Sequence, residues 1–358
     1  MSRNDDAQRL SEWLRQSTLA WFDILTIYIG QKLGFYEALH AAGPQSAADL
    51  AERTGTHPRY VREWLEQQAV TGLLAVVDAD APAEKRRFLL PVGHARVLVD
   101  RDDPLWQGSR PHSLLPHARR LGALLEAFRS GGGLRPADQD EDGRFAQATL
   151  GRVAYLEGMR DWIASMPDVE ARLSREPAAR VADLGCGAGW SSIALARSFT
   201  RARVDGFDLD PDSIAMARDN AADSGVADRV RFHVRDATDP DLGGDYDLAV
   251  VFEALHDMPR PVAALRTLRR LTGDEGIALV VDEKTEARFT APGSDLERFN
   301  YGWSVLSCLA SGMAGPGAAG TGAVMRPETL RRYAGEAGFS AVETLPVARE
   351  GWAFYRMR

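Results

Sequence analysis

The stretch of sequence that decides the fold is Val181-Ala182-Asp183-Leu184-Gly185-Cys186-Gly187-Ala188-Gly189. It passes from a short, mostly apolar run that is typical of a buried strand into three closely spaced glycines, and then into a helical pattern at 190–199. Glycine lets the backbone turn sharply and approach a ligand closely, and the helix that follows offers unpaired N–H groups. The stretch therefore predicts a strand, a ligand-binding turn and a helix.

Strands and helices continue to alternate after this turn. The patterns predict further strands at 203–207, 230–234, 246–251 and 277–281, and helices at 211–224 and 261–271. Two late strands, at about 341–345 and 351–356, would close the sheet edge as an antiparallel pair. Such alternation is typical of a parallel sheet with helices on both faces. We therefore predict an α/β fold with a doubly wound, Rossmann-like sheet in residues 176–358.

Residues 1–100 are predicted to be mostly helical. A short helix at 47–53, capped by Ser46, precedes a second helix at 58–71 and two short strands at 73–77 and 88–90. This order of elements is that of a winged helix. Residues 101–175 are predicted to form a helical linker, interrupted by loops at 131–133 and 138–143.

A winged helix often binds DNA through the second helix of its motif. Here that helix carries two arginines and two glutamates, so it has no net positive field: Arg59, Arg62, Glu63 and Glu66. We therefore expect residues 1–100 to serve in packing or dimerisation, with DNA binding as the alternative.

Composition narrows the class of protein further. The 358-residue chain has a net charge of -8, which argues against a nucleic-acid partner because phosphate binding needs clustered cations. Its two cysteines, Cys186 and Cys308, form no metal-ligand spacing, so no metal is expected. No apolar run approaches the roughly 20 residues of a membrane span. The N-terminus is polar and acidic, so we expect a soluble cytoplasmic protein.

The glycine turn does not fit a dinucleotide site. A Gly-x-Gly-x-x-Gly fingerprint that starts at Gly185 would end at Trp190, and one that starts at Gly187 would end at Ser192. Asp208 lies about 20 residues beyond the turn, where an acidic side chain can accept both ribose hydroxyls. Asp210 precedes a proline and is predicted to cap the next helix. Asp183 could hold a cationic ammonium group, directly or through water.

These motifs resemble those of class I S-adenosylmethionine-dependent methyltransferases. The turn at 181–189 resembles their first motif, Gly206-Phe207-Asp208 their ribose-binding motif, and Arg235-Asp236-Ala237 their adenine-binding turn. The resemblance implies a cofactor, S-adenosyl-L-methionine, that leaves as S-adenosyl-L-homocysteine. It implies these cofactor-binding residues: Asp183, Gly185, Cys186, Gly187, Gly189, Asp208, Leu209, Asp236, Ala237 and Phe252.

A winged-helix region before such a domain resembles bacterial small-molecule O-methyltransferases, which implies that residues 1–100 dimerise and help to cover the substrate. In that family a His-Asp pair follows the fourth strand, and the resemblance implies that His256 is the general base, with Glu253 as a second candidate. Alternatively, His256 only packs near the cofactor and Asp257 caps the next helix. This sequence departs from the family in having Met258 where the family has Trp, and it reveals no acidic partner for His256.

The acceptor pocket is implied by the same resemblance. The family places it at a helix after the fifth strand, where this chain has Tyr301 and Trp303. Residues at i and i+2 do not share a helix face, so we expect at most one ring to point into the pocket and core packing to explain the other, as it could also explain Phe252.

The predicted function is methyl transfer to a small-molecule acceptor, at a hydroxyl oxygen of a natural-product-type metabolite, by a homodimer. Three alternatives stay open: N- or C-methylation, use of the bound cofactor without methyl transfer, and a DNA-binding regulator that senses S-adenosylmethionine.

Overall fold

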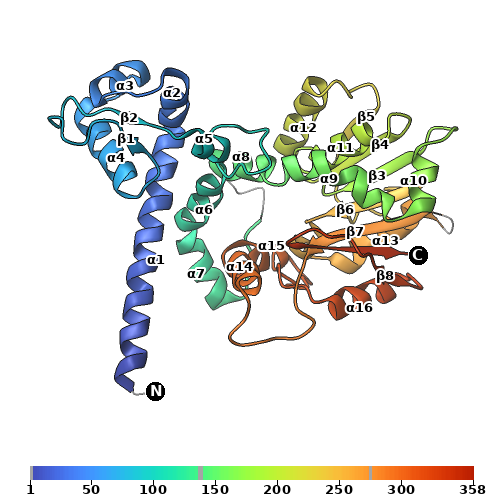
Figure 1. Ribbon diagram of the computed structural model, residues 1–358. Coiled ribbons are helices and arrows are strands. Elements are labelled where there is room, and N and C mark those ends of the chain that lie inside the picture. Colours follow the sequence, from blue (N-terminus) through green and yellow to red (C-terminus); the bar gives the residue numbers. More distant parts are fainter. Residues whose placement is uncertain (1–2, 136–139, 274–275) are drawn as a thin grey trace. The chain divides into compact units, whose positions relative to one another are not determined.

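Figure 1 shows the computed structural model of the chain, which describes residues 3–135, 140–273 and 276–358. The chain forms two compact units, Met1–Leu114 and Leu115–Arg358. The described helices include none with the length and apolar character that a membrane crossing needs.

The first unit has the predicted winged-helix order of elements. Ser46 caps α3 by accepting a hydrogen bond from the backbone N–H of Asp49, and Gly55 ends the helix in the left-handed region. The core consists of apolar side chains from these helices, among them Tyr36, whose hydroxyl bonds to Gln68. The elements of this unit and the helix that follows are α1 (Arg3–Lys32), α2 (Phe35–Ala42), α3 (Ala47–Thr54), α4 (Pro58–Val70), β1 (Ala75–Val76), β2 (Phe88–Leu89), α5 (Val92–Leu98) and α6 (Arg110–Arg119).

The second unit is built on a seven-stranded sheet of order β5-β4-β3-β6-β7-β9-β8. Its first five strands are parallel, while β9 runs antiparallel to both β7 and β8. The predicted doubly wound sheet with an antiparallel edge pair is confirmed. The strands are β3 (Arg180–Leu184), β4 (Arg203–Asp208), β5 (Val230–Val234), β6 (Leu248–Phe252), β7 (Ile277–Glu283), β8 (Val342–Thr344) and β9 (Trp352–Met357).

Helices cover both faces of the sheet because successive strand residues point to opposite sides. Val250 and Leu279 pack with the helices of one face, whereas Val251 and Val280 pack with those of the other. The first face is covered by α9 (Arg152–Ala164), α10 (Pro167–Leu173), α11 (Trp190–Ser198) and α12 (Pro211–Asp223), and the second by α13 (Pro261–Thr272) and α16 (Pro327–Ala337).

The segment predicted as a helical linker is helical, with α7 (Leu121–Ser130) and α8 (Glu141–Thr149) before α9. Gly131 ends α7 in the left-handed region, as a glycine loop would. The predicted polar loop at 138–143 is wrong in its second half, since Asp140 caps α8 by accepting from the N–H of Gly143. Residues 138 and 139 lie outside the described residues.

After β7 the chain forms α14 (Asp295–Trp303), a π-helical turn η3 (Ser304–Cys308) and the short α15 (Leu309–Gly312). A 3-10 turn, η2 (Leu255–Asp257), follows β6. These segments lie after the carboxyl ends of β6 and β7, where ligands bind in open parallel sheets.

Candidate active site

The glycine turn after β3 has the geometry of a ligand-binding loop. Gly185, Gly187 and Gly189 all have positive φ angles, of 73°, 50° and 83°. A Cβ atom on Gly185 would lie 2.9 Å from that of Ala254, and one on Gly189 would lie 2.6 Å from the Phe232 ring, so both glycines allow close packing. A Cβ on Gly187 would meet nothing within 4 Å. The backbone at Gly187 therefore borders open space.

Asp208 ties this turn to the end of the neighbouring strand. Its Oδ2 accepts a hydrogen bond from the N–H of Gly187 at 2.9 Å, and its Oδ1 accepts from the N–H of Asp210 at 2.9 Å. Burial raises the pKa of Asp208, and each oxygen keeps a lone pair for a further donor. Asp210 caps α12 by accepting from the N–H of Ser213, as predicted, while Leu209 between them is 65% exposed.

Asp183 lies fully buried in β3 beneath the turn. The hydroxyls of Ser191 and Ser192 both donate to its Oδ2, at 2.6 Å each. Its Oδ1 is buried and accepts no hydrogen bond from the described residues. Burial raises the pKa of Asp183 to about 6, so the carboxylate is charged at neutral pH and has one oxygen free for a cationic partner.

Cys186 is a small packed residue of the turn. Its sulfur would lie 3.0 Å from a Cβ on Gly206, and burial raises the pKa of its thiol well above the usual value. A neutral, buried thiol is a poor nucleophile, which leaves packing beside the turn as its role.

Asp236 and Ala237 follow β5, as the sequence predicted for an adenine-binding turn. Oδ1 of Asp236 accepts from the N–H and the hydroxyl of Thr238, at 2.7 and 2.8 Å. Its Oδ2 lies 3.4 Å from the Arg260 guanidinium. Asp236 thus stabilises this turn through its hydrogen bonds with Thr238. Its adenine-binding role stays a prediction.

His256 has an acidic partner that the sequence did not reveal. Its Nδ1 lies 2.6 Å from Oδ1 of Asp282, which is buried at the end of β7. Because a carboxylate only accepts, Nδ1 carries the proton. The structure thus supplies the acidic partner that the sequence did not identify. The sequence feature that could have indicated this partner is Asp282 itself, an acidic residue directly after the apolar strand run at 277–281.

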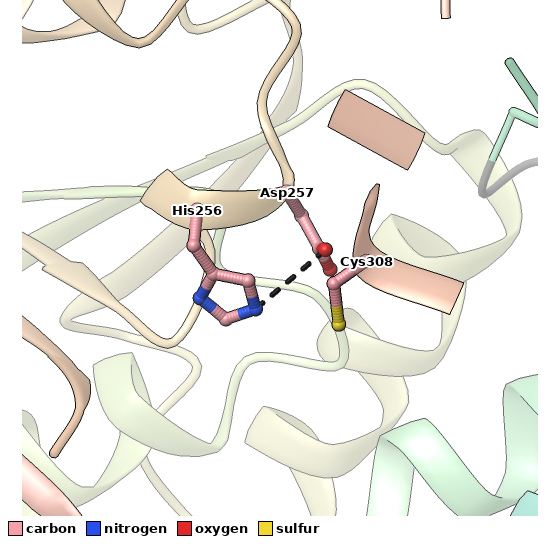
Figure 2. Close-up of side chains that lie close together, drawn as sticks. All are labelled: His256, Asp257 and Cys308. Atoms are coloured by element: carbon pink, nitrogen blue, oxygen red, sulfur yellow. Dashed lines mark ion pairs between the residues drawn. The ribbon is translucent and has the colours of Figure 1, made fainter. Parts of the chain in front are cut away.

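The second ring nitrogen of His256 faces Asp257, as Figure 2 shows. Nε2 lies 3.6 Å from Oδ1 of Asp257. Burial alone would lower the pKa of His256, but the carboxylates of Asp282 and Asp257 raise it well above the usual value. Asp257 does not cap α13, which has no side-chain cap at its N-cap residue Arg260. The capping role expected for Asp257 is therefore wrong, while the choice between base and packing residue for His256 stays open.

Glu253, directly after β6, has a strained backbone. Its φ of 49° is the only positive φ among the described non-glycine residues, and such conformations cluster at functional sites. Its carboxyl group lies within hydrogen-bonding reach of Tyr155 and Trp352. Burial, followed by the charge of Glu283, raises the pKa of Glu253 to about 8, so this carboxyl group is protonated at neutral pH.

The aromatic residues singled out by the sequence divide between core and surface contacts. Phe252 is buried and packs edge-on against Tyr155, with ring centroids 5.5 Å apart. Trp303 packs edge-on against His117 at 5.4 Å, whereas the Tyr301 hydroxyl accepts from Arg326 at 3.3 Å. Tyr301 and Trp303 therefore face different partners, as their i, i+2 spacing predicted.

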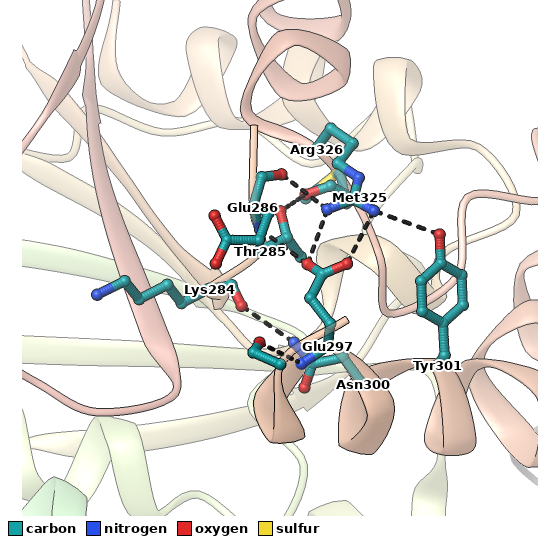
Figure 3. Close-up of polar contacts among 9 residues, drawn as sticks. Lys284, Thr285, Glu286, Glu297, Asn300, Tyr301, Met325 and Arg326 are labelled. Carbon is teal, nitrogen blue, oxygen red and sulfur yellow. Dashed lines mark hydrogen bonds and ion pairs between the residues drawn. The ribbon is translucent and has the colours of Figure 1, made fainter. Parts of the chain in front are cut away.

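A buried ion pair fixes the helix that carries these two aromatics. Arg326 donates to both oxygens of Glu297, at 2.7 and 2.9 Å, and to the carbonyl oxygen of Glu286 (Figure 3). Asn300 donates to the carbonyl oxygen of Lys284 at 3.0 Å. Together these bonds hold α14 against the chain that leaves β7, two residues beyond Asp282. Nothing in the sequence had pointed to Glu297 or Arg326 as a pair.

Comparison with known proteins identifies the family. Residues 175–315 match the family described as "Methyltransferase domain", and residues 23–100 match the "Rv2258c-like winged HTH domain". The ubiquinone biosynthesis O-methyltransferase of Xanthomonas campestris pv. campestris is 31% identical over 172 residues, which make up 44% of this chain and 70% of that protein. The chain belongs to the S-adenosylmethionine-dependent methyltransferases.

Solved structures share this methyltransferase's fold over nearly its whole length. The mitomycin 7-O-methyltransferase MmcR superposes with a TM-score of 0.75 at 19% identity, covering 99% of each chain. Human N-acetylserotonin methyltransferase, solved in complex with S-adenosylmethionine, gives 0.73 at 17% identity and covers 100% of this chain and 99% of that one. These likenesses show a shared fold.

The methyltransferase's cofactor is S-adenosylmethionine, and the residues present fit it. The cofactor carries an ammonium group, ribose hydroxyls and a sulfonium charge. The turn offers open space at Gly187, an unbonded carboxylate oxygen on Asp183 and spare lone pairs on Asp208. The residues that would bind the cofactor are therefore acidic, which suits a ligand with cationic groups.

We expect the affinity of the methyltransferase for S-adenosylhomocysteine to fall at acidic pH. Asp183 loses its charge as the pH drops through about 6. Binding should therefore weaken about tenfold between pH 7 and pH 5 if the charged carboxylate holds the ammonium group. Calorimetric titration across this range measures the change. Asp183→Asn should bind weakly with no such pH dependence, whereas a constant wild-type affinity would contradict this role of Asp183.

Proposed function

We propose that the protein methylates a hydroxyl oxygen of a small, natural-product-type molecule. The observation that carries the proposal is the buried His256–Asp282 pair, which lies at the carboxyl ends of the parallel strands β6 and β7. Asp282 fixes the ring orientation and tautomer of His256, as an acidic partner does for a catalytic base. The fold relatives whose names state an acceptor include a mitomycin and an N-acetylserotonin enzyme.

We assign cofactor binding to the turn and the strand ends around it. Asp183 would hold the ammonium group and Asp208 the ribose hydroxyls, while Gly187 lets the backbone approach the ligand. The remaining contacts are assigned, by resemblance, to Gly185, Cys186, Gly189, Leu209, Asp236, Ala237 and Phe252. The cofactor, when bound, supplies a methyl group already activated for displacement, so the protein mainly aligns the acceptor and excludes water.

His256 is the residue that we assign to proton removal. The acceptor's hydroxyl proton would pass to Nε2 while Nδ1 stays bonded to Asp282. The two neighbouring carboxylates raise the pKa of His256, which makes the neutral ring a strong base but leaves it protonated at neutral pH. Turnover of a weakly acidic hydroxyl should therefore increase as the pH rises above neutrality.

Glu253 is assigned a different role from that of a base. With a pKa of about 8 it holds its own proton at neutral pH and so donates a hydrogen bond rather than accepting a proton. Its strained backbone and its contacts with Tyr155 and Trp352 hold the chain where β6 passes into η2. Glu253 is therefore a positioning residue for His256, three residues further on.

The acceptor would bind beside η3. A pocket there combines apolar and basic groups, and Trp303 packs against one of them, His117. This cavity has a volume of about 10 Å³, room for about one water molecule, so an acceptor would enter only after these side chains move apart. The lining residues are His117, Arg120, Leu124, Leu134, Leu306, Ser307, Ala310 and Ser311.

Replacing His256 by Ala should lower turnover of a hydroxyl acceptor by about 10²–10⁴-fold, the usual contribution of a general base. The affinity for S-adenosylhomocysteine should change little, since His256 is assigned no cofactor contact. Release of S-adenosylhomocysteine in the presence of candidate acceptors measures turnover, and calorimetry measures binding. Wild-type turnover in the variant would remove His256 from the mechanism and favour an acceptor, such as an amine, that needs no base.

We infer that the protein works as a homodimer through α1. This helix exposes large apolar side chains, and three of them, Leu10, Leu14 and Trp21, recur at the spacing of one helix face.

The winged-helix unit lacks the net positive charge that DNA binding needs. Arg59 pairs with Glu63 at 2.6 Å, and Arg62 pairs with Glu84 at 3.1 Å. Both cysteines are free thiols, which suits a reducing cytoplasm.

The dimer proposal predicts that Leu14→Lys shifts the molecular mass in solution from dimer to monomer. The side chain of Leu14 is 53% exposed, and a buried ammonium group at an apolar interface would be strongly unfavourable. Gln16→Lys is the matched control, since its position faces the other side of α1 and bonds to Glu12. Light scattering after size exclusion measures the mass. A monomeric wild type would contradict the proposal.

A further inference from the structure

Three chemically different metal-binding side chains converge, and one of them is the proposed base. His256, Asp257 and Cys308 each offer one ligand atom, and these atoms lie within 4.8 Å of one another. In Figure 2 the imidazole ring, the carboxylate and the thiol point toward a common centre. Nitrogen, oxygen and sulfur donors together are the set that binds zinc and related divalent transition metals, whereas calcium and magnesium prefer oxygen alone.

The imidazole is held as a metal-binding imidazole usually is. Asp282 accepts a hydrogen bond from Nδ1 of His256 at 2.6 Å, which leaves Nε2 as the ligand atom on the side of Asp257 and Cys308. A carboxylate bonded to the remote nitrogen of a histidine orients the ring and increases its basicity toward a metal. This contact is independent of the three ligand atoms themselves.

The other two ligands also have features that a metal would explain. Oδ1 of Asp257 is buried and accepts no hydrogen bond from the described residues, although it lies 3.6 Å from Nε2 of His256. Cys308 is the last residue of η3, in which the N–H of Leu309 bonds to the carbonyl oxygen of Ser304. Such π-helical turns are rare and occur frequently at functional sites.

We propose that His256, Asp257 and Cys308 bind a zinc-type divalent metal ion, with Asp282 supporting the histidine. Binding would displace the proton on Nε2 of His256 and the thiol proton of Cys308, while Asp257 binds as the carboxylate. Three protein ligands leave the fourth position of a tetrahedral shell to water or to an acceptor oxygen. Metal entry would draw the ligand atoms to the roughly 3.5 Å separations of such a shell.

Metal binding would also control the reaction, and this consequence rests on the proposed function. A metal on Nε2 occupies the atom that we assign to proton removal. The metal-loaded protein therefore cannot use His256 as a base, so zinc should reversibly inhibit methyl transfer to a weakly acidic hydroxyl. Binding itself needs neither the acceptor nor the cofactor and can be measured without turnover.

The test is titration of the metal-free full-length protein with Co²⁺, which reports a thiolate ligand through a sulfur-to-metal charge-transfer band. We expect one equivalent to give the band in the wild type and in Cys186→Ser, which removes the only other cysteine. Cys308→Ser should lack the band, and Zn²⁺ should abolish it in the wild type. Asp282→Asn should weaken binding by about 10–100-fold.

No band in the wild type, or a band that persists in Cys308→Ser, would overturn the metal site. Circular dichroism of each variant shows whether it is folded, and His256→Gln gives a second ligand variant that keeps all thiols. Failure of the methylation assay with a normal Co²⁺ band would count against the proposed function alone. Failure of the band with normal methyl transfer would count against the metal site alone.

Discussion

The carboxylate of Asp208 is the constraint on which the site depends. It ends β4, and its two oxygens accept the backbone N–H groups of Gly187 and Asp210. A single side chain thus joins the turn after β3 to the start of α12. Glycine adopts left-handed and right-handed backbone about equally well, so this hydrogen bond selects one of several conformations open to Gly187. The open approach at Gly187 exists because this contact holds the turn in place.

The second half of the site gathers four acidic side chains, of which Glu253 holds its proton at neutral pH. Asp183, Glu253, Asp257 and Asp282 all lie near the carboxyl ends of β3, β6 and β7, and burial raises the pKa of the first three. An acidic, partly desolvated site suits a sulfonium cofactor, because a cation stabilises the carboxylates that burial disfavours. The same carboxylates raise the pKa of His256 and would also favour the metal ion that we propose there. Binding of a cationic ligand here and protonation of His256 would therefore be electrostatically coupled.

Sequence patterns predicted most of the fold because each strand and helix of the sheet domain has its own local pattern of apolar residues. The strand at 230–234 has the predicted bounds, and the parallel order follows from the regular alternation of strands and helices. Asp282 was missed because it meets His256 only through the pairing of β6 with β7, a contact that no local spacing reveals. Cys308 lies near His256 and Asp257 because it ends the π-helical turn η3, and no sequence pattern had predicted that turn. The positive φ of Glu253 was equally invisible, since non-glycine residues rarely adopt it.

The most direct test of the account is calorimetric titration of S-adenosylhomocysteine into wild type, Asp208→Ala and Asp212→Ala. Asp212 lies in the first turn of α12 with its side chain 67% exposed, so its removal changes the charge equally without touching the turn. We expect micromolar binding, about 8 kcal/mol, in the wild type and in Asp212→Ala, and its loss in a folded Asp208→Ala. Unchanged affinity in Asp208→Ala would contradict the account, because the cofactor would then bind without the contact that holds its site together.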